Sequence, residues 1–234
     1  MIDKMFKKAR LLNKEKDKEL KISPLANYKH ARNVHTIPIG MNEVGEASKH
    51  YPIFFLRDSE GIVPFVLLGL KEGENKFVNN AGEWRKNRYI PALIRAYPFI
   101  LSKSGNNENI NLSVAIDDEY EGINKKDGNR VFDDEGKPTE FGNQIIKYLQ
   151  DLYGMLESTK KSAKLLDEAV LLQQIDATIE QKENKEKFVL QGLLQVDAEK
   201  LNQLSDEMLL KLAKTGVLNL IYAHLNSRSN FQNF

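Results

Sequence analysis

Cysteine is absent from this 234-residue chain, which excludes disulfides, thiolate metal sites and a cysteine nucleophile. Long apolar runs are also missing, since none approaches the ~20 residues that a membrane-spanning helix needs. The net charge is only +1 with histidines neutral, so nothing favours a long-range attraction to nucleic acid or to an anionic membrane. We therefore expect a protein with no transmembrane segment and no nucleic-acid partner.

The N-terminus lacks the apolar core of a signal peptide, which runs to roughly 7–15 residues. Charged residues interrupt the first twelve positions throughout, and we therefore expect a cytoplasmic protein. Residues 1–21 contain eight Lys or Arg against four Asp or Glu, a local net charge of +4. We interpret this stretch as a basic N-terminal arm, flexible or partly helical and solvated. A role in binding an acidic partner or a membrane surface stays open.

Recognisable catalytic and metal-binding motifs are missing as well. No glycine pattern matches a phosphate loop, and there is no Gly-x-Ser-x-Gly nucleophile elbow. His30 and His35 do not form a zinc motif, and we interpret them as surface or hydrogen-bonded side chains. Two acidic clusters, at residues 117–121 and 133–135, do not fit calcium-loop spacing, so we expect solvated turns. The sequence predicts no metal site and no cofactor.

What the chain does contain is enough apolar sequence for a sizeable core. Hydrophobic residues make up 41% and charged residues 29%, both ordinary for a globular protein. Strand patterns dominate the first half and helix patterns the second. This order predicts an α+β fold, in which a mostly antiparallel sheet from the first half packs with helices from the second half. We assign residues 22–234 to a single domain.

A β-hairpin is predicted where apolar runs at 53–56 and 62–70 flank Asp58-Ser-Glu-Gly61, a turn signal that ends in glycine. Successive rather than alternate residues of these runs are apolar, so both faces of the strands should be covered. A short strand is predicted at 35–39. A short helix is predicted at 42–50, with Asn42 as its N-cap.

Helices are predicted through most of the second half. Thr139 is the predicted N-cap of a helix whose apolar residues recur every three or four positions. We expect Ser158-Thr159 to break this helix before a second one over 163–175. A late strand is predicted at 188–194.

The C-terminal helices have clear boundary signals. Asp197 and Ser205 are predicted N-caps of two short helices. Gly216 is predicted to end the second of them in a left-handed conformation. A final helix should follow at 218–225.

Arginine and aromatic side chains gather between residues 84 and 97. Arginine beside aromatic rings is the composition of a recognition surface, through stacking, cation–π contact and bidentate carboxylate binding. The alternative is that the rings belong to the core and the arginine stems cover it. The candidate ligand- or partner-binding residues are Trp84, Arg88, Tyr89, Arg95, Tyr97 and His224.

Six motifs, all in order along the chain, resemble the SapC family of bacterial proteins. They are Tyr51-Pro-Ile-Phe-Phe, Leu67-Leu-Gly-Leu70, Glu74-Asn75-Lys76-Phe77-Val78 followed by Gly82-x-Trp84, Tyr89-Ile-Pro-Ala92, Arg95-Ala-Tyr-Pro-Phe-Ile-Leu101 and the tail 216–230 with Ile221-Tyr-Ala-His-Leu225. The chain departs from the family at Lys76, where leucine is common, and at Ala96, where a second arginine is common. An anion site made by an arginine pair would therefore be weakened here.

The resemblance implies a link to the secretion of surface-layer (S-layer) proteins, because the family is named for a gene lying with that secretion apparatus. It implies no catalytic residues. We therefore expect a cytoplasmic binding or accessory protein rather than an enzyme, with surface-layer protein or type I secretion components as partners; a homo-oligomer stays open. The alternative is an enzyme or enzyme partner acting on a peptide or small anionic ligand through Trp84, Tyr89 and Arg95, with His224 as acid or base.

Overall fold

The fold is seen in a computed structural model, which describes residues 2–106, 109–180, 185 and 187–234. The largest sheet has five antiparallel strands in the order β10-β11-β4-β5-β3. Their bounds are β3 (Thr36–Pro38), β4 (Ile53–Asp58), β5 (Gly61–Leu67), β10 (Leu172–Glu180) and β11 (Lys187–Val196).

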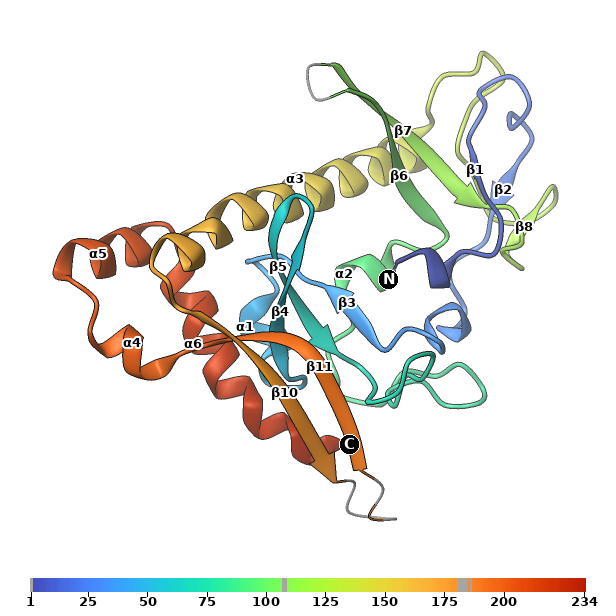
Figure 1. Ribbon diagram of the computed structural model, residues 1–234. Coiled ribbons are helices and arrows are strands. Elements are labelled where there is room, and N and C mark those ends of the chain that lie inside the picture. Colours follow the sequence, from blue (N-terminus) through green and yellow to red (C-terminus); the bar gives the residue numbers. More distant parts are fainter. Residues whose placement is uncertain (1, 107–108, 181–184, 186) are drawn as a thin grey trace.

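Two smaller antiparallel sheets lie on the other side of the molecule (Figure 1). One has the order β1-β7-β6 and the other β8-β2-β9. Their strands are β1 (Ala9–Leu11), β2 (Lys21–Ile22), β6 (Phe99–Asn106), β7 (Asn109–Asp117), β8 (Ile123–Asn124) and β9 (Asn129–Arg130).

One long helix, α3, crosses between the sheets and contacts both β5 and β6 (Figure 1). The α-helices are α1 (Val44–Ala47), α2 (Ala92–Arg95), α3 (Glu140–Glu168), α4 (Ala198–Asn202), α5 (Asp206–Lys214) and α6 (Val217–Ser227). Three 3₁₀ turns are η1 (Ile2–Met5), η2 (Lys29–Ala31) and η3 (Arg228–Asn233). The predicted α+β class is confirmed.

The predicted hairpin is β4–β5, and apolar residues cover both of its faces as expected. Alternate strand residues point to opposite sides. Phe55 and Val66 lie in the main core, whereas Phe54, Phe65 and Leu67 form a second buried cluster with Leu193 of β11. Continuous apolar sequence is therefore what a strand covered on both faces needs.

Two helix predictions are corrected. Only the single turn α1 forms within the helix predicted at 42–50. Its N-cap residue is Glu43 rather than Asn42, and no side chain makes a capping bond there. α3 runs unbroken through Thr159, because the buried Thr159 hydroxyl donates to the Met155 carbonyl (2.7 Å) and accepts from the Met41 amide (2.9 Å). These bonds tie the helix to the Met41 loop instead of breaking it.

The C-terminal predictions are mostly confirmed. Asp197 accepts from two amides at the start of α4, and Ser205 accepts from the Met208 amide at the start of α5. Gly216 is left-handed, with φ 76°. The exception is the end of the stretch predicted as a second helix at 163–175: α3 covers it as far as Glu168, but β10 begins at Leu172 and pairs along its length with β11. Pairing with the next strand of the chain outweighed the local helical pattern at residues 172–175.

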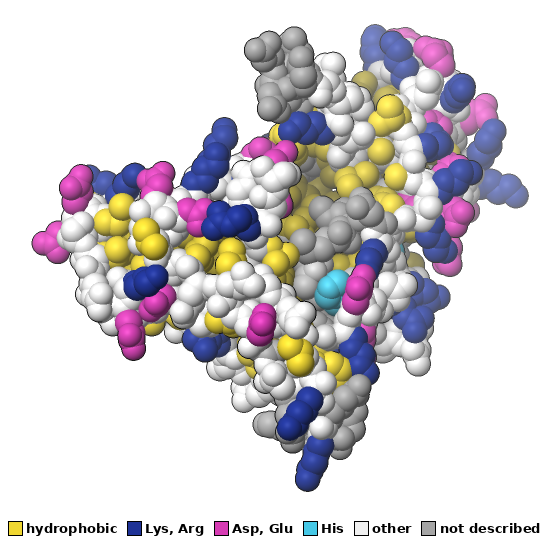
Figure 2. Space-filling model, viewed as in Figure 1, with side chains coloured by type: hydrophobic (Ala, Val, Ile, Leu, Met, Phe, Trp, Pro, Cys, Tyr) yellow, Lys and Arg dark blue, Asp and Glu magenta, His cyan; other side chains and the backbone are white. Residues whose placement is uncertain are grey.

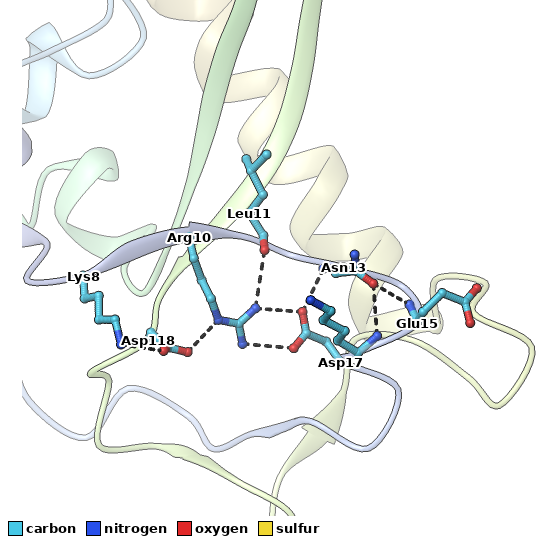
Figure 3. Close-up of polar contacts among 8 residues, drawn as sticks. Lys8, Arg10, Leu11, Asn13, Glu15, Asp17 and Asp118 are labelled. Atoms are coloured by element: carbon cyan, nitrogen blue, oxygen red, sulfur yellow. Dashed lines mark hydrogen bonds and ion pairs between the residues drawn. The ribbon is translucent and has the colours of Figure 1, made fainter.

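Within residues 2–21, β1 and the first residue of β2 pair with strands of the two smaller sheets. β1 pairs with β7. Figure 3 shows the Arg10 guanidinium between two carboxylates: it bonds Asp17 through two nitrogens (2.8 and 2.9 Å) and Asp118 through Nε (2.6 Å). Hydrogen bonding to Asp17 outweighs burial and raises the pKa of Arg10. The division of the chain at residue 22 stays a prediction.

Asp117 corrects the prediction that the acidic cluster at 117–121 is a solvated turn. Its side chain is fully buried and accepts the backbone amides of Lys7 (3.0 Å) and Lys8 (2.9 Å) and the hydroxyl of Tyr97 (3.0 Å). Burial by itself raises the pKa of Asp117, but these hydrogen bonds outweigh burial and lower it. A charged carboxylate satisfied by donors is stable inside the protein.

Candidate functional site

The structure brings three of the predicted site residues into one hydrogen-bonded network, places Arg88 beside it, and separates the other two. Trp84, Tyr89 and Arg95 share the network, which also includes Tyr51 and Glu43. Tyr97 and His224 each belong to a different part of the core.

Trp84 anchors the loop that follows β5. It is only 8% exposed, and its indole Nε1 donates to the Tyr51 hydroxyl (3.2 Å). That hydroxyl in turn donates to the Tyr89 carbonyl, so Trp84 and Tyr51 together hold the backbone that carries Tyr89. Burial raises the pKa of Tyr51 well above its usual range. The indole N–H is therefore occupied inside the protein.

Glu43, which sequence analysis missed as a site residue, organises the next part of the network. It is 5% exposed, and its Oε1 accepts from the Tyr89 hydroxyl (2.8 Å) and from the Ala92 amide at the start of α2 (2.7 Å). Burial and this contact with Glu43 raise the pKa of Tyr89 to about 12. Glu43 lies four residues before the buried Ala47, and residues four apart lie on the same face of a helix. This spacing could have revealed that Glu43 faces the core.

Arg95 packs on the outside of this network. Its guanidinium lies over the Tyr89 ring, 5.8 Å from the ring centroid, and its Nε donates to the Ile90 carbonyl (3.0 Å). Arg88 lies nearby, with Nη1 3.3 Å from Nδ1 of His50. The charge of Arg95 thus makes a cation–π contact inside the protein itself.

Tyr97 belongs to a separate aromatic cluster under the N-terminal segment. Its hydroxyl donates to Asp117 (3.0 Å) and its ring stacks on His30, with centroids 3.9 Å apart. His30 Nε2 lies 3.1 Å from the Ile94 carbonyl, which makes it the protonated nitrogen. Burial lowers the pKa of His30 to about 4, so the ring is neutral at pH 7.

His224 is fully buried and acts as a bridge between two strands. Its Nδ1 donates to the Ile53 carbonyl of β4 (2.6 Å), and its Nε2 accepts from the Val196 amide of β11 (3.2 Å). Ser227, one turn further along α6, accepts from the Ile53 amide (2.8 Å). Burial lowers the pKa of His224 to about 4. Both ring nitrogens are used, which leaves His224 no role as an acid or base toward a ligand.

The register of the sheet explains why a histidine lies there. Leu194 of β11 pairs with Phe55 of β4, and the same register would put Val196 opposite Ile53. The imidazole of His224 stands between those two residues and supplies the donor and acceptor that a direct backbone pair would have exchanged. It therefore continues the connection between β4 and β11 beyond their paired residues.

Two open hollows lie beside these clusters. The first, about 350 Å³, has Tyr28, Trp84, Arg88 and Ile90 among its walls. The second, about 590 Å³, is lined partly by His30, Tyr97 and Tyr120. Ala26 and Asn27 line both hollows, so the two adjoin. Of the predicted site residues, Trp84, Arg88 and Tyr97 reach these surfaces.

A third, apolar groove lies between α3 and β6. It measures about 130 Å³ and is lined by side chains including Phe6, Phe99, Leu101, Leu152 and Leu156. Figure 2 shows hydrophobic side chains gathered in a hollow beside β6. The groove has a smaller volume than either of the two hollows.

No group of three or more metal-ligating side chains comes together in the part of the chain that the structure describes. Among the helices described, none is both long enough and apolar enough to cross a membrane. The fold and site define an α+β protein whose candidate residues build internal networks beside two open polar hollows.

A family model described as SapC matches residues 12–234, nearly the whole chain. The protein belongs to the SapC family. No curated protein and no solved structure matches it.

Proposed function

We propose that this SapC-family protein is a cytoplasmic binding or accessory protein in the secretion of surface-layer proteins. The observation that carries the proposal is the pair of adjoining hollows, which together offer an open polar surface to a partner. The buried carboxylates behind this surface hold its backbone in place. Glu43 positions the chain at Tyr89, and Asp117 positions the N-terminal segment. Such pre-organisation reduces the entropic cost of binding.

The test is direct binding between purified components. The full-length protein is immobilised and challenged separately with the surface-layer protein of the source bacterium and with each soluble part of its type I exporter. An unrelated secreted protein of similar size is the control. We expect saturable binding to at least one secretion component and none to the control. Absence of binding to every component would refute the proposal.

A second candidate function is an enzyme or enzyme partner that acts on a peptide or small anionic ligand. One observation favours its binding half: Trp84 and Arg88 line the same hollow. The catalytic part of this candidate assigned the acid or base role to His224. Both nitrogens of His224 are hydrogen-bonded inside the core, so His224 does not fill that role. A folded Arg88→Ala variant with unchanged binding of peptides and small anions would count against this candidate.

A further inference from the structure

The two adjoining hollows carry an excess of positive charge on a nearly neutral protein. Seven Lys or Arg side chains and three carboxylates line them, although the whole chain has a net charge of only +1. Local charge of one sign on a concave surface attracts ligands of the opposite sign. The seven cations are Lys4, Lys7, Lys29, Arg32, Arg85, Lys86 and Arg88.

Five of these cations have no carboxylate partner among the described residues. Arg32 bonds only the amide oxygen of Asn80 (2.8 Å), and Arg88 lies against the His50 ring (3.3 Å). Lys29, Arg85 and Lys86 are exposed. By contrast, Lys4 is paired with Glu72, and Lys7 is 4.0 Å from Glu119. The five unpaired cations are free to meet carboxylates of a partner.

The three carboxylates are too few to neutralise the seven cations. Glu83 is held by the side-chain amide of Asn79 (2.8 Å). Glu119 lies beside Lys7, and Glu121 lies with it in the second hollow. The lining of the first hollow contains Arg85, Lys86 and Arg88 but one carboxylate, that of Glu83.

The shape of the surface favours a chain over a small anion. Cations line both hollows, and aromatic side chains share the walls with them, with Tyr28 and Trp84 in the first hollow and Tyr97 and Tyr120 in the second. A small anion is held by donors that converge on one point. Separated cations with aromatic walls suit a segment that alternates carboxylate and apolar side chains.

We infer that the two hollows form one docking surface for an extended, acidic polypeptide segment. The inference rests on the proposed binding function and adds the surface and the chemistry of the bound segment. Carboxylates of the segment pair with Arg85 and Lys86 in the first hollow and with Lys29 and Arg32 in the second. Its apolar side chains lie on the aromatic walls between them.

The test uses the full-length protein and two fluorescein-labelled peptides, each long enough to cross both hollows. One alternates Glu or Asp with Leu or Tyr; the other has Lys at every acidic position. Trp84 is the only tryptophan and lines the first hollow, so its fluorescence reports binding there. We expect the acidic peptide to bind, to change Trp84 emission and to weaken as salt rises; the basic peptide should not bind.

Charge reversal locates the site. We expect R85E/K86E and K29E/R32E each to weaken acidic-peptide binding by about tenfold or more, since each adds repulsion and removes two ion pairs. The matched control K161E/K214E makes the same charge change at exposed positions outside the hollows and should stay within about twofold of the parent. Circular dichroism confirms that all three variants fold.

Three outcomes would overturn the inference: no binding of the acidic peptide, equal binding by all three variants, or equal displacement by inorganic phosphate or single-stranded DNA at matched charge. Its failure is distinguishable from that of the proposed function. If R85E/K86E and K29E/R32E still bind a secretion component, the proposed function stands and this surface is wrong. If the acidic peptide binds while no secretion component does, the surface stands and the proposed function fails.

Discussion

Buried polar residues decide much of the local geometry of this protein. Glu43, Asp117 and His224 each lie in the core and each satisfies backbone groups from segments far away in the sequence. A buried polar group is costly unless it is hydrogen-bonded. These three side chains therefore specify how loops, strands and the N-terminal segment meet, rather than serving as reactive groups.

The lowered pKa values of His30 and His224 predict a loss of stability in mild acid. The folded protein keeps both rings neutral down to about pH 4, whereas the unfolded chain protonates them near pH 6.5. The unfolded state thus binds more protons between these values, so stability is full above pH 6.5 and falls as the pH drops. Each histidine should lower the free energy of unfolding by about 2 kcal/mol between pH 7 and pH 5.

Urea unfolding at pH 7 and pH 5 measures this loss. His224→Gln keeps an amide donor and acceptor but does not titrate, so its stability should depend less on pH than that of the parent. NMR titration provides the direct check: a His224 ring that titrates near 6.5 in the folded protein would contradict the prediction.

At the scale of elements, the starts of α3, α4 and α5 follow local sequence signals, whereas the length of α3 follows packing. The Thr139, Asp197 and Ser205 caps lie where predicted. α3, in contrast, continues past its expected break because Thr159 bonds a loop 118 residues away in sequence. Gly142 and Gly154, both in α3, also differ in this way: packing governs the first and local helix propensity the second.

Gly142 and Gly154 form a matched pair for substitution by alanine. A Cβ at Gly142 would lie 2.2 Å from the Val131 carbonyl oxygen, whereas a Cβ at Gly154 would meet nothing within 4 Å. We expect Gly142→Ala to destabilise the protein by about 2 kcal/mol through this backbone clash. Gly154→Ala should stabilise it by about 0.5–1 kcal/mol, because alanine loses less backbone entropy in a helix. Thermal unfolding of both variants measures the difference; equal effects would be inconsistent with the packing described.

At the scale of the whole molecule, one core joins distant parts of the chain. Met5 from the N-terminal segment, Phe55 from the hairpin, Leu152 from α3 and Ile221 from α6 belong to the same buried cluster. The N-terminal segment therefore contributes to the core as well as to the charged surface.

Deletion of residues 1–21 tests how far this segment is independent of the rest. The deletion removes Met5 from the core and leaves Asp117 without the Lys7 and Lys8 amides. We expect the free energy of unfolding to fall by about 3 kcal/mol or more, measured by Trp84 fluorescence and far-UV circular dichroism in urea. Asp117→Asn should reproduce part of the loss without shortening the chain. An unchanged midpoint for the deletion would show that the segment is an independent arm.

The sequence was sufficient where structure depends on near neighbours. The hairpin at Asp58–Gly61, the helix caps and the left-handed Gly216 follow from short-range signals, because a turn or a cap is formed by residues only a few positions apart. The α+β class followed from the same signals taken in order. The family motifs, too, are runs of neighbouring residues.

Only the tertiary structure decided what distant residues do to one another. It buried Asp117, the first residue of an acidic run, against the Lys7 and Lys8 amides, and it set His224 between Ile53 and Val196. It also split the candidate site and brought Lys29 and Arg32 beside the hollow that holds Trp84. These arrangements depend on contacts across more than a hundred residues or between separate loops. Local propensity carries no information about such contacts, because burial and pairing arise only when the chain is folded.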